Sequence, residues 1–263
     1  MSLERFLGLP GKANDEKVLR LKDILGKLSI GCARIIEERV DLQFDALRTL
    51  HENLKDKGLF MKLVMANAVV SYQLSGRGED WWWEFSRYFS DNPPDDGIVE
   101  AYSSFLPRSR TNRRLVTPKV SRLERFEPFL DSLSFRDLRD YYFGGMTHLR
   151  NEIARVLNSK ENAKTIVFAV KMFGYAGRIV FGEFVPYPME IEIPEDSRIT
   201  AYTKRFTDEK PAGFWSRIGR ETGIPPLHID SILWPLLGGN ERVMERLRLH
   251  CREYELALKL LSL

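Results

Sequence analysis

The sequence predicts a mainly α-helical protein, and three observations lead to that fold class. Apolar residues recur at spacings of three and four in most segments of the 263-residue chain, as in amphipathic helices. Breakers containing glycine or proline, such as residues 75–78 and 92–97, separate these segments. Strand-like alternation is confined to residues 179–193. We therefore expect two helical subdomains flanking a cleft, with a small β-hairpin insertion near 179–193.

The expected helices of the N-terminal half follow from this periodicity. The first covers residues 15–39, although Gly26 and Gly31 weaken its continuity. The next two cover residues 40–54 and 59–74, and another amphipathic stretch follows Trp81, Trp82 and Trp83. After an aperiodic basic segment, helices are expected to resume at about Lys119.

The C-terminal half is expected to continue in helices on both sides of the hairpin. Residues 135–142 and 147–157 form two helices that Gly144 and Gly145 separate by a turn, and residues 162–172 form a buried helix. Four more helices are expected after the hairpin, at residues 200–206, 214–222, 228–236 and 240–261. With no internal repeat or linker, we expect a single domain over residues 1–263, built from two interleaved helical subdomains.

Composition limits the class of protein. A hydrophobic content of 43% with 29% charged residues is typical of a folded globular chain. No stretch approaches the roughly 20 apolar residues of a membrane span, and the N-terminal residues 1–12 contain no long apolar run. We expect a protein inside the cell that does not bind membranes. Cys32 and Cys251 are too few for a disulfide framework or an all-cysteine metal site, and buried thiols are expected.

The strongest local charge bias lies between Arg108 and Arg125. The net charge of the chain is only +3, but this segment holds seven basic residues against the single acid Glu124. The basic residues are Arg108, Arg110, Arg113, Arg114, Lys119, Arg122 and Arg125. Such a run is usually a solvated loop, and the alternative is a strip that contacts phosphates.

Known cofactor motifs are absent from the sequence. The four histidines show no HExxH spacing, no CxxC pair occurs, and no glycine-rich phosphate loop precedes a Lys-Ser or Lys-Thr pair. We therefore expect no metal, nucleotide or iron–sulfur cofactor.

One segment resembles the centre of a DNA repair enzyme. Lys164 stands near the start of a predicted helix and is followed by the Pro-x-Asp-x-Arg turn Pro194-Glu195-Asp196-Ser197-Arg198, an arrangement that resembles helix-hairpin-helix DNA glycosylases. Residues 72–79 and 228–234 look like those of the archaeal 8-oxoguanine DNA glycosylase/lyase (AGOG) family. The Leu-Pro-Gly-x-Gly hairpin of the superfamily is absent, and residues 157–163 replace it, as in the archaeal branch.

The resemblance implies a fold of the helix-hairpin-helix glycosylase type and a bifunctional enzyme. Such an enzyme excises 8-oxoguanine from DNA through a lysine Schiff base and then cleaves the strand by β-elimination. It implies Lys164 and Asp196 as the catalytic pair, DNA containing oxidised guanine as the partner, a monomer without cofactor, and a location in the prokaryotic cytoplasm or nucleoid. The implied base-binding residues are Gln43, Trp81 or Trp82, Phe168, Asp230 and Trp234.

The residue types fit that chemistry. A nucleophilic amine must be partly deprotonated, and we expect burial among residues 166–168 to favour the neutral form of Lys164. Lys171 is the rival, because it lies seven residues on and on nearly the same helical face; the resemblance selects Lys164. Asp196 is expected to cap a helix N-terminus, where a carboxylate stays ionised.

Aromatic and polar side chains could form a pocket for a base that has left the DNA stack. Asp230 and Trp234 are four residues apart, as are Lys164 and Phe168, so each pair projects from one side of a helix. Taken singly, each aromatic residue is more often part of a core. The sequence leaves two alternatives open: a glycosylase for another damaged base, or a non-catalytic helical DNA-binding protein.

Overall fold

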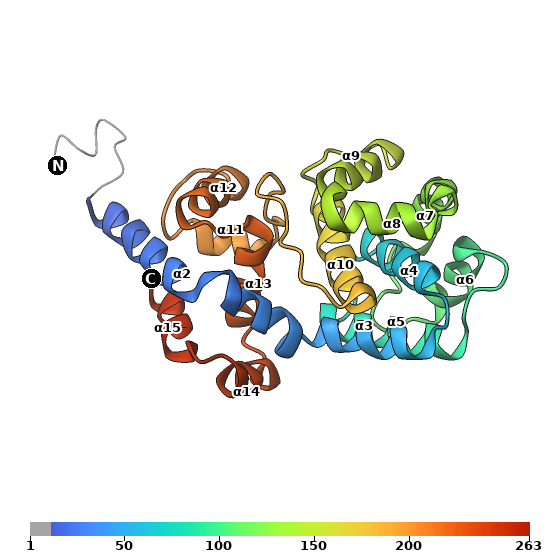
Figure 1. Ribbon diagram of the computed structural model, residues 1–263, viewed down its shortest axis with the longest axis horizontal. Coiled ribbons are helices and arrows are strands. Elements are labelled where there is room, and N and C mark those ends of the chain that lie inside the picture. Colours follow the sequence, from blue (N-terminus) through green and yellow to red (C-terminus); the bar gives the residue numbers. More distant parts are fainter. Residues whose placement is uncertain (1–11) are drawn as a thin grey trace. The chain divides into compact units, whose positions relative to one another are not determined.

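The computed structural model describes residues 12–263, and every regular element in that range is helical (Figure 1). The prediction of a mainly helical fold is confirmed. The expectation for the N-terminal residues concerns positions that, apart from Lys12, lie outside the described range. No helix among the described residues is long and apolar enough to cross a membrane.

The described chain divides into two compact units. The first unit combines the residues up to Asp41 with Met189–Leu263, and the second is the continuous stretch Leu42–Pro188. The N-terminal helix therefore groups with the C-terminal part of the chain. The grouping of both units into one domain stays a prediction.

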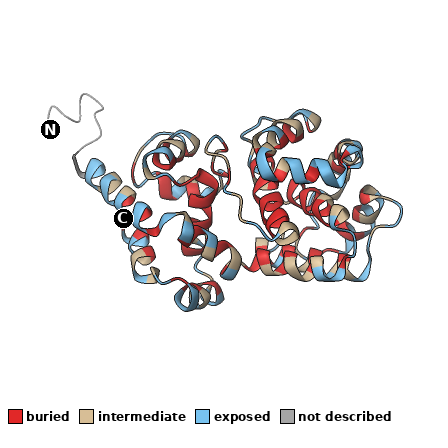
Figure 2. Ribbon diagram, viewed as in Figure 1, coloured by how far each residue is buried: buried red, intermediate tan, exposed pale blue. Residues whose placement is uncertain are grey.

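The first unit is built around a buried helix, α13 (Pro226–Gly238), in which most side chains are inaccessible to solvent (Figure 2). The other helices of the unit either contact α13 directly or pack on α2. They are α2 (Lys12–Arg39), α11 (Ser197–Thr203), α12 (Pro211–Thr222), α14 (Glu241–His250), α15 (Tyr254–Leu258) and the 3₁₀ turn η3 (Lys259–Ser262).

The second unit is built around α10 (Lys164–Phe181), which packs along α4 (Lys57–Val69). Both helices are buried over most of their length (Figure 2). The surrounding elements are α3 (Leu42–Asn53), α5 (Gly78–Asp91), α6 (Ile98–Phe105), η1 (Leu106–Arg108), α7 (Val116–Ser132), α8 (Phe135–Asp140), η2 (Tyr141–Gly145) and α9 (Met146–Val156).

The predicted β-hairpin near 179–193 is wrong, since the described residues contain no strand. Residues 179–181 continue α10, which ends at Gly182 with a left-handed φ of 70°. The backbone that follows is held by tyrosine side chains instead of a partner strand. Tyr142 Oη donates a short hydrogen bond to the carbonyl of Glu183 and accepts one from the amide of Val185. Pro186 and Pro188 further disfavour a ladder, because proline has no N–H to donate.

Two glycines allow this segment to lie against α10. A Cβ atom at Gly174 would clash with the ring of Tyr187, and one at Gly177 would clash with the ring of Tyr142. The hydroxyl of Tyr187 donates to the carbonyl of Lys171 at 2.7 Å. Because glycine has no side chain, the two tyrosine rings can pack directly against the backbone of α10 at these positions.

Three helix boundaries also differ from the prediction. The first helix is interrupted at Ser29, whose φ of 62° is non-helical, and not at either glycine. Gly144 and Gly145 form no turn, because a π-helical segment connects α8 and α9. The long C-terminal helix expected over 240–261 is broken after His250, where Cys251 turns toward α2 before α15 begins.

Candidate active site

Lys164 is the first residue of α10, and its side chain is exposed. The expected partial burial is therefore wrong. The reason is positional, since Ile166 and Val167 turn into the core while the first residue of the helix points outward. Ala163 precedes Lys164 without providing a side-chain cap, so the ammonium or amine lies at an uncapped helix N-terminus.

Lys171 is the buried lysine of the same helix. Only 5% of its surface is accessible, and its backbone carbonyl accepts the hydrogen bond from Tyr187. Burial alone would therefore favour Lys171 as the desolvated amine. Lys164 is exposed, as a nucleophile that must reach a DNA sugar has to be. The structural feature that favours Lys164 is therefore its accessibility and not the expected burial.

Asp196 caps α11, as predicted. Its Oδ1 accepts backbone hydrogen bonds from Arg198 and Ile199, both at 2.9 Å. Both bonds use the same oxygen, so among the described residues Oδ2 has no hydrogen-bond donor. The carboxylate is half-buried. The two backbone bonds fix the orientation of the carboxylate, while Oδ2 stays available for chemistry.

The structure brings two of the predicted aromatic residues together in the second unit. The rings of Trp82 and Phe168 are in edge contact, with centroids 6.1 Å apart and an interplanar angle of 70°. Trp81 instead belongs to the core, where its ring stacks on Phe105 and its indole N–H donates to Ser71 Oγ at 2.8 Å. Both indole rings are buried, but Trp82 contacts Phe168, so Trp82 is the better candidate for supporting a base-binding pocket.

Gln43 lies on α3 in the second unit, and its side chain is buried. Its helix packs along α5, which carries Trp82. A Cβ atom at Gly78, the first residue of α5, would lie 3.9 Å from Gln43 Nε2. This is an ordinary van der Waals distance, and it shows that the amide of Gln43 lies beside the start of α5.

Asp230 and Trp234 lie on α13 in the first unit. Asp230 is buried and Trp234 is half-buried. The guanidinium of Arg198 lies over the Trp234 ring, 5.1 Å from its centroid. Sequence reasoning did not assign a role to Arg198, although it is the last residue of the Pro-x-Asp-x-Arg turn. Its contact connects the start of α11, where Asp196 lies, to the aromatic residue of α13.

A buried contact between a histidine and a carboxylate beneath α13 was also missed. His228 Nδ1 lies 2.8 Å from Glu37 Oε1, and both side chains are fully inaccessible. Glu37 belongs to α2, so the pair ties α2 to the helix that carries Asp230. The two residues are 191 positions apart, and no local pattern connects them.

The basic segment is held in place by one carboxylate. Glu84 of α5 accepts hydrogen bonds from the backbone amides of Arg110 and Thr111 and from the hydroxyls of Ser109 and Thr111. Burial raises the pKa of Glu84, but these four hydrogen bonds together lower it further, so the net pKa lies below the usual value. The loop thus has a defined backbone, although its arginines are exposed.

Two members of the predicted basic strip are not fully exposed. Lys119 is fully buried, where it donates to Asn112 Oδ1 and to the carbonyl of Arg114, and burial lowers its pKa to about 8. Arg122 is half-buried and donates to Thr165 Oγ1 at 3.0 Å, next to Lys164 along α10. The accessible strip therefore consists of Arg108, Arg110, Arg113, Arg114 and Arg125.

Comparison with known proteins gives consistent matches. The family model described as AGOG, N-glycosylase/DNA lyase, matches residues 22–261. An N-glycosylase/DNA lyase of Thermococcus kodakarensis is 66% identical over 263 residues and covers all of both chains. Another, from Methanopyrus kandleri, is 52% identical over 210 residues, which are 80% of this chain and 86% of the relative. A similar fold is found in the crystal structure of an 8-oxoguanine DNA glycosylase from Pyrobaculum aerophilum, complexed with 8-oxoguanosine, with a TM-score of 0.75. The two sequences are 24% identical, and the match covers 90% of this chain and 99% of that one.

Proposed function

The chain belongs to the AGOG family of N-glycosylase/DNA lyases, and we propose that it excises 8-oxoguanine from DNA with Lys164 as the nucleophile and Asp196 as the catalytic carboxylate. The observation that carries the assignment of roles is the placement of the two residues. Lys164 is an exposed lysine at the start of a buried helix. Asp196 caps the N-terminus of α11 with Oδ1, and its Oδ2 atom takes no part in the cap. The relative solved with 8-oxoguanosine supports the choice of lesion.

The lysine takes part both in breaking the glycosidic bond and in breaking the DNA strand. The neutral amine of Lys164 attacks C1′ of the damaged nucleotide, the N9–C1′ bond breaks, and the base leaves with the bonding electrons and takes up a proton. Loss of a proton from nitrogen and opening of the sugar ring give a Schiff base. This imine acidifies C2′, so loss of the C2′ proton expels the 3′ phosphate by β-elimination. Water then releases the lysine.

Asp196 stabilises the charge that develops on the sugar. Breaking a glycosidic bond gives an oxocarbenium-like transition state, and an ionised carboxylate lowers its energy. The backbone bonds to Oδ1 fix the orientation of the group, and the Oδ2 atom is available to face the sugar or to take up a proton. Capping and catalysis are therefore compatible roles for one side chain.

Each of the two units carries predicted pocket residues that suit recognition of a damaged base. Phe168, half-buried against Trp82, offers an aromatic face for stacking, and Trp234 offers another. Gln43 and Asp230 supply an amide and a carboxylate that can read the edge of a purine. This assignment of base recognition rests on the residue types and their placement on α3, α10 and α13.

The exposed arginines of the segment 108–125 are proposed to contact DNA phosphates of the same substrate. Glu84 fixes the backbone at residues 109–111, and helix α7 fixes Arg125, so the exposed guanidinium groups suit this role better than those of a flexible loop would. A substrate in chromosomal DNA places the enzyme in the cytoplasm or nucleoid. The lysine chemistry needs no metal, and we propose that the enzyme acts as a monomer.

A panel of damaged duplexes tests the choice of lesion. Duplexes carrying 8-oxoguanine, an oxidised pyrimidine or an alkylated purine are incubated with the enzyme, and the released base and the strand ends are analysed. We expect release of 8-oxoguanine with a β-elimination product and little reaction with the others. Preferential release of an oxidised pyrimidine or alkylated purine would contradict the proposed substrate while leaving the lyase chemistry intact.

A further inference from the structure

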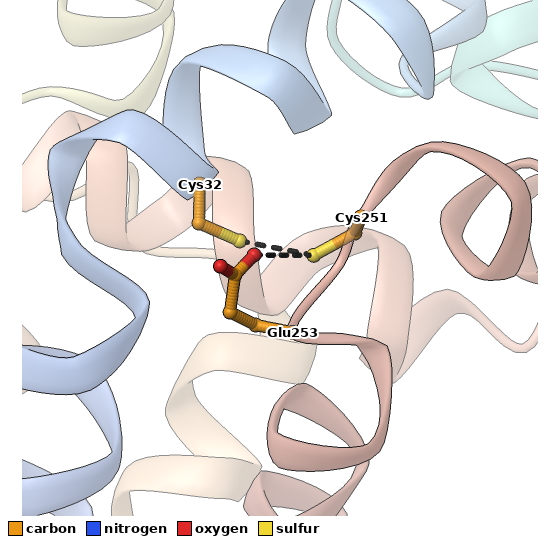
Figure 3. Close-up of side chains that lie close together, drawn as sticks. All are labelled: Cys32, Cys251 and Glu253. Atoms are coloured by element: carbon orange, nitrogen blue, oxygen red, sulfur yellow. Dashed lines mark hydrogen bonds between the residues drawn. The ribbon is translucent and has the colours of Figure 1, made fainter.

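The two cysteines of the chain lie side by side although they are 219 residues apart. Cys32 Sγ and Cys251 Sγ are 3.1 Å from each other, and one thiol donates a hydrogen bond to the other (Figure 3). Both side chains are 97% buried, with 3% of their surface accessible. Because the sequence contains no third cysteine, neither thiol has another possible disulfide partner within the chain.

We propose that Cys32 and Cys251 form a redox couple that closes to an intramolecular disulfide and ties α2 to the C-terminal segment. This inference is independent of the proposed catalytic chemistry. Cys32 lies in the part of α2 that follows the break at Ser29, and Cys251 lies in the turn between α14 and α15. The two sulfur atoms are already 3.1 Å apart, so closing the bond needs a rotation of side chains and no movement of helices.

The electrostatic asymmetry of the pair assigns a role to each thiol. Hydrogen bonding to Cys251 and burial raise the pKa of Cys32, whereas the hydrogen bond from Cys32 lowers the pKa of Cys251. Cys251 is therefore the thiol that loses its proton more readily, and we assign it as the attacking group. Glu253 Oε2 lies 3.8 Å from Cys251 Sγ, so its negative charge opposes the thiolate and slows the reaction (Figure 3).

A low-molecular-weight disulfide such as oxidised glutathione supplies the oxidising equivalents. The Cys251 thiolate attacks one sulfur of the small disulfide and releases the other as a thiolate. Cys32 then loses its proton and attacks the Cys251 sulfur, which releases the second small thiol. Two protein thiols are oxidised, and one small disulfide is reduced to two thiols.

The disulfide would stabilise the elements that carry the candidate site in the first unit. The C-terminal segment contacts α13 through α15 and η3, and Tyr202 of α11 donates to the carbonyl of Leu260 at 2.6 Å. A covalent connection that encloses most of the chain strongly restricts the unfolded state. We expect the oxidised protein to melt about 5–10 °C above the reduced protein.

The experiment compares full-length protein equilibrated with oxidised glutathione or with dithiothreitol. One portion of each sample is unfolded in N-ethylmaleimide, and its mass is measured. The melting temperature is measured on a second, folded portion. We expect the oxidised monomer to lose two hydrogen atoms, take no label and melt higher, whereas the Cys32→Ser/Cys251→Ser double variant should melt identically in both buffers. Retention of both thiols, a stable glutathione adduct, or equal melting temperatures of the two wild-type samples would overturn the proposal.

Glu253→Gln provides a second measurement that tests the chemistry of the pair. The variant removes the negative charge beside Cys251, so we expect disulfide formation at least several-fold faster than in the wild type. An unchanged rate would contradict the role assigned to the Cys251 thiolate. The three side chains also resemble part of a metal site. Protection of both thiols by added Zn²⁺, with no disulfide formed in oxidised glutathione, would assign a metal site and overturn the redox couple.

Discussion

The carboxylate of Glu37 and the imidazole of His228 form a fully buried pair, with Oε1 2.8 Å from Nδ1. Removing one member would leave the other polar group in the core without this partner. We expect Glu37→Ala to lower the free energy of unfolding by about 3–5 kcal/mol. Chemical denaturation with urea measures this loss.

A surface pair of the same helix is the control for this prediction. Glu38 pairs with Arg34 four residues earlier at 2.9 Å, and both are more accessible than Glu37. Glu38→Ala should cost less than about 1 kcal/mol, because exposed pairs contribute little. Equal costs for the two variants would show that the buried pair does not hold α2 to α13.

Asp196→Asn should separate the catalytic role from the capping role. Asparagine caps helices about as well as aspartate, so the fold and DNA binding should be kept while the charge is lost. We expect a loss of turnover of 100-fold or more, measured with an 8-oxoguanine duplex under single-turnover conditions. Asp196→Ala, which removes both functions, should in addition lower stability by about 1 kcal/mol. An active Asp196→Asn enzyme would limit Asp196 to capping.

Phe168→Ala should weaken recognition of the base. Stacking of a base on an aromatic side chain contributes about 1–3 kcal/mol, so kcat/KM should fall roughly 10- to 100-fold. Phe168 is half-buried, which makes this variant milder to the fold than removal of the buried Trp82 ring. Phe135→Ala is the matched control, because Phe135 is 44% exposed on α8, and its kcat/KM should be unchanged. Equal losses in the two variants would argue against stacking on Phe168.

Glu84→Gln should loosen the basic loop. A glutamine can accept at one oxygen only, so part of the set of four hydrogen bonds is lost. We expect weaker DNA binding, measured by fluorescence anisotropy at two salt concentrations. Glu100→Gln makes the same charge change at an exposed position of α6 and should leave affinity unchanged or slightly higher. Weakening in both variants would contradict a specific role for Glu84.

Glu84 also predicts a dependence of stability on pH. Because its pKa in the folded protein is depressed, its contribution is complete above the pKa of the unfolded chain and is lost as the pH falls through the folded value. The wild type should therefore lose stability below about pH 5 faster than Glu84→Gln does. Melting curves between neutral and acidic pH measure the difference, and parallel curves for the two proteins would contradict the prediction.

Local patterns predicted most of the helices and the Asp196 cap, because both depend on residues within one or two turns. The apolar run at residues 179–181 was assigned to a strand because short apolar runs fit either structure. Two tyrosines decided the outcome. Tyr142 binds the backbone of Glu183 from 41 residues earlier in the chain, and Tyr187, between Pro186 and Pro188, binds the backbone of α10. Periodicity alone did not reveal this long-range packing.

The candidate site shows the same limit. The spacing of Asp230 and Trp234 placed both on one helix, as found. The exposure of Lys164, the core position of Trp81 and the pairs Glu37–His228 and Cys32–Cys251 depend on contacts between distant segments. The Pro-x-Asp-x-Arg pattern was visible in the sequence, but only the folded structure shows that Arg198 lies over the ring of Trp234.

Trapping of the covalent intermediate tests the central claim about Lys164 most directly. The enzyme reacts with an 8-oxoguanine duplex in the presence of borohydride, which reduces the Schiff base to a stable protein–DNA adduct, and the linked lysine is identified by peptide mass analysis. Lys164→Gln and Lys171→Gln are compared with the wild type. We predict an adduct at Lys164 that is absent in Lys164→Gln and retained in Lys171→Gln. An adduct that persists in Lys164→Gln and disappears in Lys171→Gln would contradict the assignment and make the buried lysine the nucleophile.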